Sequence, residues 1–373
     1  MIGGDIERQR DVCKRLAPSD HNDNAANRPQ PGHTLGGAEQ GERMRKPLLA
    51  IVSVLVLAGG PSHAQSPDAF YHGKTVTYVV ATAPGGGYDT YGRLIARYLG
   101  KYLADARVIV QNVPGAGHIV GADEVYVAKP DGLTIGTFNT GLIFAQLLKQ
   151  QGVKFDLGNM SWIGKAASDP RVLVLAKNSG IKNWQELTDA AKAPFKFYVG
   201  GVGSAAYIDT KMAVQALHLN IDIIPGFNGN EGAMSMLRGE TVGTIGSASS
   251  LRSFVDQGNG FIALAVGGTM GSIPQATDFV KSDRDRQLIS LITAESEIER
   301  LTAGPPGIAE DRLAYLRAAY IKALGDPALL ADAKRLSLPI EPADGPATEK
   351  TIKNALNQSP ETITLLAEAA KAQ

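Results

Sequence analysis

The chain has 373 residues, of which 37 are lysine or arginine and 37 are aspartate or glutamate, so its formal net charge is zero. A balanced charge argues against nucleic acid or another polyanion as a partner, because proteins that bind polyanions carry a basic excess. The hydrophobic fraction of 44% is typical of a soluble globular protein, and the length indicates two domains.

The N-terminal region contains a predicted export signal behind a polar extension. Residues 1–43 include the single cysteine, Cys13, and are interpreted as a non-native or disordered extension. From Met44 the chain reads MRKPLLAIVSVLVLAGGPSHAQS, with a basic start, an apolar core too short to cross a bilayer comfortably, and a small-x-Ala site. The sequence therefore predicts translation from Met44, a signal peptide over residues 44–64 cleaved near Ala64, and a periplasmic product. The alternative is an uncleaved membrane anchor.

The first half of the mature chain alternates strands with helices. Apolar runs predict strands at residues 75–82, 107–112 and 133–138. Between them, apolar residues at helical spacing predict helices at residues 90–104 and 119–128. This alternation predicts a parallel sheet covered by helices on both faces.

A second series of the same kind begins after the segment SDP at residues 168–170. Its predicted strands are residues 171–176, 195–200, 221–226, 241–246 and 261–266. Its predicted helices are residues 184–192, 205–217, 230–238 and 249–257. Two separate strand–helix series indicate two α/β lobes.

The tail is predicted to be helical from about residue 309 and is expected to pack on the first sheet, because it is too short to form a core alone. The predicted architecture is therefore an α/β protein with two lobes and two crossings between them, near residue 168 and near residues 295–303. Lobe one would comprise residues 67–167 plus 300–373, and lobe two residues 168–299.

The segment VVATAPGGGYD at residues 79–89 predicts an anion-binding loop between the first strand and the first helix. A dinucleotide site is excluded because Thr90 stands where G-x-G-x-x-G needs its third glycine. A P-loop is excluded because Gly100-Lys101 is followed by tyrosine inside the helix. Main-chain N–H groups at a helix start suit the carboxylate of a small organic acid. The alternative is a tight turn in which Asp89 is only the helix N-cap.

Signatures of catalysis and metal binding are weak in the mature chain. Ser204 lacks the flanking glycines of a nucleophile elbow. The three histidines, His72, His118 and His218, have no metal-ligand spacing, and His118 in the turn PGAGH is predicted to be a surface residue. The sequence therefore predicts a protein that is not an enzyme and that has neither a cofactor nor a metal site.

Loops of small residues recur after the other predicted strands. NTG follows the third strand of lobe one, and GGVGSAAY, GFNGN and GSASS follow strands of lobe two. Ligands of open α/β sheets bind at the carboxyl ends of the strands. We therefore expect these loops to converge on one cleft.

The chain resembles the Bug-type substrate-binding proteins of tripartite tricarboxylate transporters over essentially the whole mature region. The resemblance rests on strand–APGGGYD–helix and on three longer segments, VIVQNVPGAGHIVGADEVYVAKPDGLTIG (108–136), GNMSWIGKAASDPRVLVLAKNSGIKNWQEL (158–187) and EGAMSMLRGETV (231–242). It implies a periplasmic binding protein of the Venus-flytrap type, a monomer that closes on a small carboxylate such as a di- or tricarboxylate. The implied partners are this ligand and the membrane permease subunits, with no role for nucleic acid.

The resemblance also implies a ligand site at the first glycine loop, partly through ordered waters, and at loops of the other lobe. Carried over residue by residue, the implied site comprises Pro84, Gly85, Gly86, Gly87, Tyr88, Asp89, Asn139, Thr140, Gly203, Ser204 and Ser247. The chain departs from the family pattern at Gly243, where an acidic residue is common, in IPGFNGN, which lacks the usual Tyr-Lys, and at His118, where a small residue is usual. The family's ligands therefore do not transfer directly.

Arg171 is a further candidate from its position alone, since it follows SDP at the first crossing between lobes. Two interpretations stay open: it pairs with a second ligand carboxylate, or it is a solvated arginine at a strand start. The function predicted for the whole chain is an extracytoplasmic receptor for a small carboxylate. The alternatives are an exported enzyme acting on such an acid, with Asp89 as the candidate base, and a solute receptor for a signalling protein.

Overall fold

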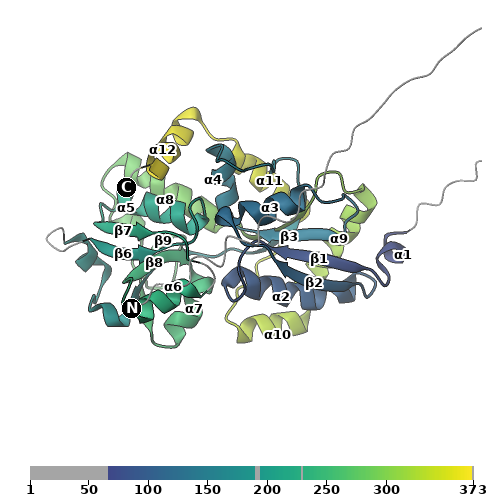
Figure 1. The fold of residues 1–373 in the computed structure, drawn as a ribbon, viewed down its shortest axis with the longest axis horizontal. Helices are drawn as coiled ribbons and strands as arrows, with labels where there is room; N and C mark the ends of the chain where they lie inside the picture. The colour runs from purple at the N-terminus through teal and green to yellow at the C-terminus, as the bar shows by residue number, and fades with distance from the viewer. Residues whose placement is uncertain (1–65, 190–193, 228–229, 372–373) are drawn as a thin grey trace, which may run out of the picture. The chain divides into compact units, whose positions relative to one another are not determined.

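The computed structural model describes residues 66–189, 194–227 and 230–371, which belong to one compact unit, His63–Gln373. The predicted extension, the signal peptide and Cys13 lie outside the described residues. Two sheets with flanking helices form two lobes, which lie side by side in Figure 1. The predicted two-lobed α/β fold is confirmed.

The first lobe is built on a six-stranded sheet in the order β11-β4-β10-β3-β1-β2. Its strands are β1 (Thr75–Val80), β2 (Arg107–Asn112), β3 (Thr134–Phe138), β4 (Ser161–Ala167), β10 (Glu299–Gly304) and β11 (Ala343–Asp344). Its helices are α1 (Pro67–Tyr71), α2 (Gly87–Leu99), α3 (Ile119–Tyr126), α4 (Gly141–Leu147), α9 (Glu310–Leu324), α10 (Pro327–Arg335) and α11 (Gly345–Leu356).

The second lobe is built on a five-stranded sheet in the order β7-β6-β8-β5-β9. Its strands are β5 (Arg171–Ala176), β6 (Phe195–Tyr198), β7 (Ile221–Ile224), β8 (Gly243–Ser247) and β9 (Gly260–Gly267). Its helices are α5 (Ala205–Ala216), α6 (Glu231–Leu237), α7 (Ala248–Asp256) and α8 (Asp283–Ser296). The helix predicted at residues 184–192 is a short 3-10 helix over Trp184–Thr188.

Both sheets are mixed, so the parallel pairing predicted from the alternation of strands and helices holds only for part of each sheet. Strands β1, β2 and β3 pair in parallel as expected, but β10 runs antiparallel to β3 and β4. In the second sheet, β5 runs antiparallel to β8 and β9. The reason is connectivity: β5 and β10 are the strands that enter a sheet from a crossing, so each begins where the neighbouring strands end.

The last helix, α12 (Pro360–Lys371), corrects the prediction that the whole tail packs on the first sheet. Its buried residues Leu365, Leu366 and Ala369 belong to the hydrophobic core of the second lobe, with Ile208 and Met212 of α5. Helices α9 and α10 do pack on the first lobe, where Leu316, Tyr320 and Leu329 are fully buried. The chain between α11 and α12 is therefore a third connection between the lobes, and α12 lies beside α5 and α8 in Figure 1.

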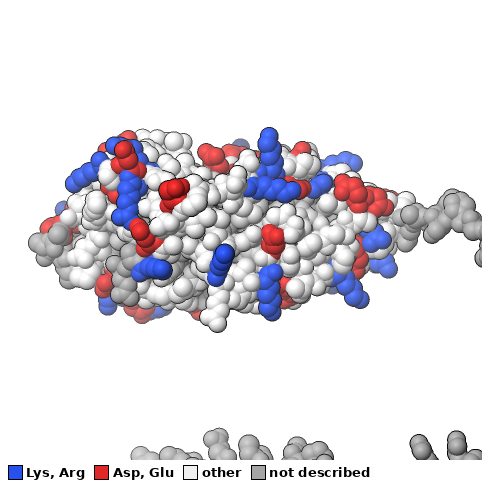
Figure 2. Space-filling model, turned by 90° about the horizontal axis from the view of Figure 1, so that it is seen from above, with Lys and Arg blue, Asp and Glu red and all other residues white. Residues whose placement is uncertain are grey.

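The surface carries charges of both signs. On the face shown in Figure 2, lysine and arginine side chains alternate with aspartate and glutamate side chains, and no extended patch of one sign is visible. Within the described part of the chain, no helix has the length and apolar character needed to cross a membrane.

Candidate functional site

A cleft of about 390 Å³ is lined by loops of both lobes, most of them at the carboxyl ends of strands. From the first lobe come Gly86–Tyr88 after β1, Pro114–His118 after β2 and Asn139 after β3. From the second lobe come residues that follow β6, β7 and β8, among them Ser204, Phe227, Asn230, Ser247 and Ser250. The loops predicted to converge therefore do so, at the edge where open α/β sheets bind ligands.

The glycine loop places the start of α2 at this cleft. Helix α2 begins at Gly87, three residues earlier than predicted, and Gly86 is its N-cap in an extended conformation. Gly85 has φ +92°, which a residue with a side chain rarely adopts, so this glycine is the one that the turn requires. The first N–H groups of a helix have no partner within it, and Gly87 and Tyr88, the first two residues of α2, line the cleft.

Asp89 stabilises the loop but is the third residue of α2 and not its N-cap. Its carboxylate accepts hydrogen bonds from the Gly85 N–H at 3.0 Å and from the Arg93 and Asn112 side chains at 2.9 Å. Burial would raise the pKa of Asp89, but these hydrogen bonds outweigh it and hold the pKa below its usual value. Asp89 is absent from the described cleft lining, and its bonds lie within lobe one.

Asn139 lines the cleft and has an unused hydrogen-bond acceptor. The residue follows β3 and is 4% exposed, and its Oδ1 atom has no partner among the described residues. A buried acceptor without a partner is costly unless a donor, from water or from a hydroxyl or N–H of a ligand, completes it. Thr140, the neighbouring candidate, turns away from the cleft, because its hydroxyl donates to Glu295 and accepts from Arg171.

In the second lobe, Ser204 and Ser247 reach the cleft while Gly203 does not. Ser204 is the N-cap of α5, and its Oγ atom accepts a bond from the Tyr207 N–H at 3.3 Å. The Ser247 hydroxyl donates to Ser250 Oγ at 2.8 Å. Gly203, with φ +87°, lies against Gln150 of the first lobe.

The predicted site is therefore only partly assembled at the cleft. Pro84 lines a neighbouring opening with Asn230 and Arg238. The candidates that line the cleft itself are Gly86, Gly87, Tyr88, Asn139, Arg171, Ser204 and Ser247.

His118 is a cleft residue that the sequence analysis placed on the surface. Its ring lies edge-on to that of Tyr88, with centroids 5.2 Å apart, and its Nδ1 atom is buried without a partner in the described structure. Burial lowers the pKa of His118 to about 4, so the ring is neutral at neutral pH. Its position after β2, at the same sheet edge as the other loops, is the signal that could have identified it.

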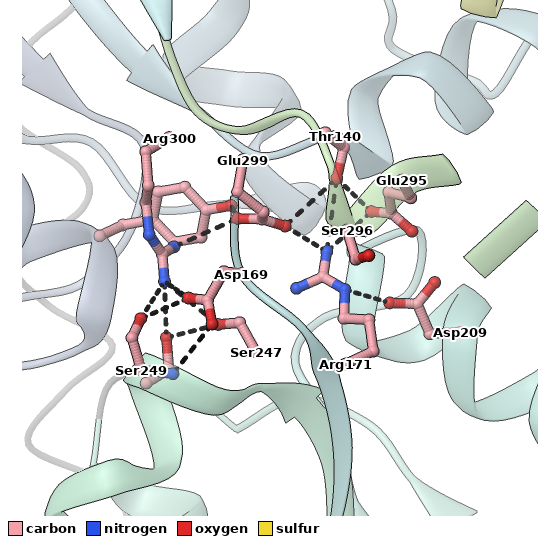
Figure 3. A network of polar contacts seen from close by, with 12 residues as sticks. Thr140, Asp169, Arg171, Asp209, Ser247, Ser249, Glu295, Ser296, Glu299 and Arg300 are labelled. Atoms are coloured by element: carbon pink, nitrogen blue, oxygen red, sulfur yellow. Dashed lines mark hydrogen bonds and ion pairs between the residues drawn. The ribbon is translucent and has the colours of Figure 1, made fainter. Parts of the chain in front are cut away.

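Arg171 is the first residue of β5 and is surrounded by carboxylates of the protein (Figure 3). Its guanidinium lies 2.9 Å from Asp209 and 2.9 Å from Glu295, and it also contacts Glu299. The side chain is 3% exposed, so the interpretation as a solvated arginine is wrong. Burial and the neighbouring Glu295 raise the pKa of Asp209 well above its usual value.

Arg300 occupies the second crossing on the other side of Glu299 (Figure 3). It is fully buried, contacts Asp169 at 2.9 Å and Glu299 at 3.4 Å, and lies over the ring of Tyr88. Burial would raise the pKa of Glu299, but Arg171 and Arg300 outweigh it and lower the pKa. The Tyr88 hydroxyl donates to Glu299, so the glycine loop is bonded directly to the second crossing.

The lobes approach each other closely beside the cleft. A Cβ atom added to Gly117 would lie 2.5 Å from the Ser204 nitrogen, and one added to Gly141 would lie 2.5 Å from the Ala205 nitrogen. Both glycines belong to lobe one and both targets to lobe two. These glycines therefore permit main-chain contact between the lobes.

Comparison with known proteins assigns the fold and the family. The sequence model of the tripartite tricarboxylate transporter family receptor matches residues 92–359. A UPF0065 protein from the tcbD-tcbE intergenic region of Pseudomonas sp. (strain P51) is 29% identical over 181 residues, 48% of this chain and 53% of that protein. The matched part thus spans about half the length of such curated relatives.

Two solved structures share the fold. The periplasmic binding protein BugD matches with a TM-score of 0.68 and 21% identity over 80% of this chain and 98% of its own. MatC from Rhodopseudomonas palustris with bound malate matches with a TM-score of 0.65 and 18% identity over 79% of this chain and 99% of its own.

Proposed function

Because this chain belongs to the tripartite tricarboxylate transporter family of receptors, we propose that it captures a small carboxylate between its lobes and delivers it to a membrane permease. The observation that carries the proposal is the cleft in which the N-terminus of α2 faces loops of the second lobe. Unpaired N–H groups and the positive end of the helix dipole favour a carboxylate there. The fold shared with a malate-bound protein supports the same ligand chemistry.

The proposed ligand contacts are those candidates that reach the cleft: the Gly86–Tyr88 main chain, Asn139, Ser204 and Ser247. We add His118, whose neutral ring faces the same cleft. An exported enzyme is less well supported, because the candidate base Asp89 is held by Gly85, Arg93 and Asn112.

The test is a melting-temperature screen of the purified protein with mono-, di- and tricarboxylates and their matching amides. A ligand at one hundred times its dissociation constant adds about 2.7 kcal/mol to the free energy of unfolding. For a protein of this size the expected rise in melting temperature is on the order of 5 °C. Acids should produce the rise and amides should not, since the site supplies N–H donors for a full negative charge. Equal shifts by acids and amides would refute a carboxylate site.

We also propose that the protein is exported to the periplasm after cleavage near Ala64, as the sequence of residues 44–64 indicates. N-terminal sequencing of the periplasmic protein is expected to begin at or near Gln65. Recovery of a periplasmic form that still carries residues 1–43 would contradict this.

A further inference from the structure

The charges around the cleft indicate a narrower class of ligand than membership of the family does. Of the described residues that line the cleft, Arg171 is the single lysine or arginine, and none is acidic. Arg171 already contacts Asp209, Glu295 and Glu299, so its positive charge is compensated by the protein. A carboxylate removed from water is costly unless it is paired or well hydrogen-bonded.

The other charged side chains near the cleft also have partners. Arg238 follows α6 and binds Glu240 through two hydrogen bonds, at 2.6 and 2.8 Å. Arg252 of α7 binds Asp256 at 2.9 Å. Two helix starts therefore reach the cleft, that of α2 and that of α5, whose first residues Ala205 and Ala206 also line it. No unpaired cation lies among the described lining residues for a second carboxylate.

The second-lobe side of the cleft carries large apolar side chains. Met234 and Leu237 of α6 are 48% and 43% exposed, although both are large and hydrophobic, and both line the cleft. Phe227 packs against Tyr198 with ring centroids 5.6 Å apart. Phe254 of α7, a buried residue, also lines the cleft. Exposed apolar side chains gathered in a concave site are typical of a surface that contacts a ligand.

We propose that the cleft selects a monocarboxylate with an apolar body: the carboxylate lies at Gly86–Tyr88, and the body lies against Phe227, Met234 and Leu237. This inference rests on the proposed function and names the ligand class of that site. The neutral polar groups Asn139, Ser204 and Ser247 orient the acid, and the adaptable thioether of Met234 accommodates bodies of different shape.

The experiment measures binding by calorimetry with three probes: 3-phenylpropanoate, its para-carboxylated analogue 3-(4-carboxyphenyl)propanoate, and succinate. The monoacid should bind at least tenfold more tightly than either diacid. A variant, Leu237→Lys, adds a cation to the apolar wall at a half-exposed position. The variant should bind 3-phenylpropanoate at least tenfold more weakly than the unaltered protein does, and it should bind the para-carboxylated analogue more tightly.

The matched control is Leu336→Lys, which makes the same change at a leucine that is 50% exposed and absent from the cleft lining. It should leave all three affinities unchanged. Equal or tighter binding of a diacid by the unaltered protein would overturn this inference and leave the proposed function standing. Failure to bind any carboxylate would overturn both. An unchanged order of affinities in Leu237→Lys would show that the body of the ligand does not lie at α6 and would also overturn the inference.

Discussion

Replacing Arg300 by methionine is expected to lower the free energy of unfolding by about 3–5 kcal/mol. The guanidinium is fully buried between the carboxylates of Asp169 and Glu299, and it also donates to Ser249 at 2.8 Å. Methionine fills similar space but leaves the buried Asp169 carboxylate without its cation and leaves Glu299 with Arg171 alone. Leaving a buried charge uncompensated costs far more than losing an exposed pair.

Thermal or urea unfolding measures this effect, with an expected fall in melting temperature on the order of 10 °C. Arg238→Met is the control, because Arg238 pairs with Glu240 at 2.6 Å but its side chain is 52% exposed. The expected cost is about 0–1 kcal/mol. Adding Asp169→Asn to Arg300→Met should restore part of the loss, because the amide needs no cation. Equal losses in Arg300→Met and Arg238→Met would show that burial does not govern the strength of this network.

Replacing Gly141 by alanine is expected to weaken ligand binding roughly 10- to 100-fold. The residue begins α4, where alanine fits the backbone, but its Cβ atom would lie 2.5 Å from the nitrogen and 2.9 Å from the Cα atom of Ala205. A main-chain clash between lobes cannot be relieved by rotating a side chain. Overpacking of this kind costs about 1–3 kcal/mol, and here it opposes the close approach of the two lobes seen in this structure.

Two measurements distinguish this effect from unfolding. Residues 65–373 contain no cysteine, so cysteines introduced at exposed Val127 and Lys182 give one label on each lobe. The distance between the labels should increase in Gly141→Ala while the protein still melts cooperatively. Gly325→Ala, where the added Cβ has ordinary contacts within its own helix region, should change neither the distance nor the affinity. Unchanged affinity in Gly141→Ala would mean that this contact plays no part in closure.

Helices and strands were predictable from the sequence wherever the pattern of hydrophobic residues determines them. The strands at residues 107–112 and 171–176 have the predicted bounds because continuous apolar or alternating runs end at turn residues. The directions of the strands could not be derived in the same way. Strand β10 is antiparallel to β3 and β4 because the chain enters it from the second lobe, and the hydrophobic pattern does not reveal that crossing. Helix α4 was missed because its residues Gly141–Ala145 are all buried, which removes the periodicity that identifies an amphipathic helix.

The residues of the candidate site also fall into those that the sequence predicts and those that depend on contacts between distant segments. The glycine loop and Asn139 were predictable because loops after parallel strands meet at one edge. The partners of Arg171 were not, since Glu295 is 124 residues away in the sequence and reaches Arg171 only through the packing of α8. His118 was misplaced because its burial depends on the ring of Tyr88, which belongs to another loop.

The third connection between the lobes affects when each lobe can finish folding during synthesis. Leu365, Leu366 and Ala369 complete the core around α5, yet they are among the last residues added during synthesis. A nascent chain can assemble much of the first sheet earlier, but the second lobe has an open apolar face until α12 emerges. Acquisition of the complete fold is therefore delayed until translation has ended, so the unfinished chain stays without its final core for as long as the ribosome holds its C-terminus.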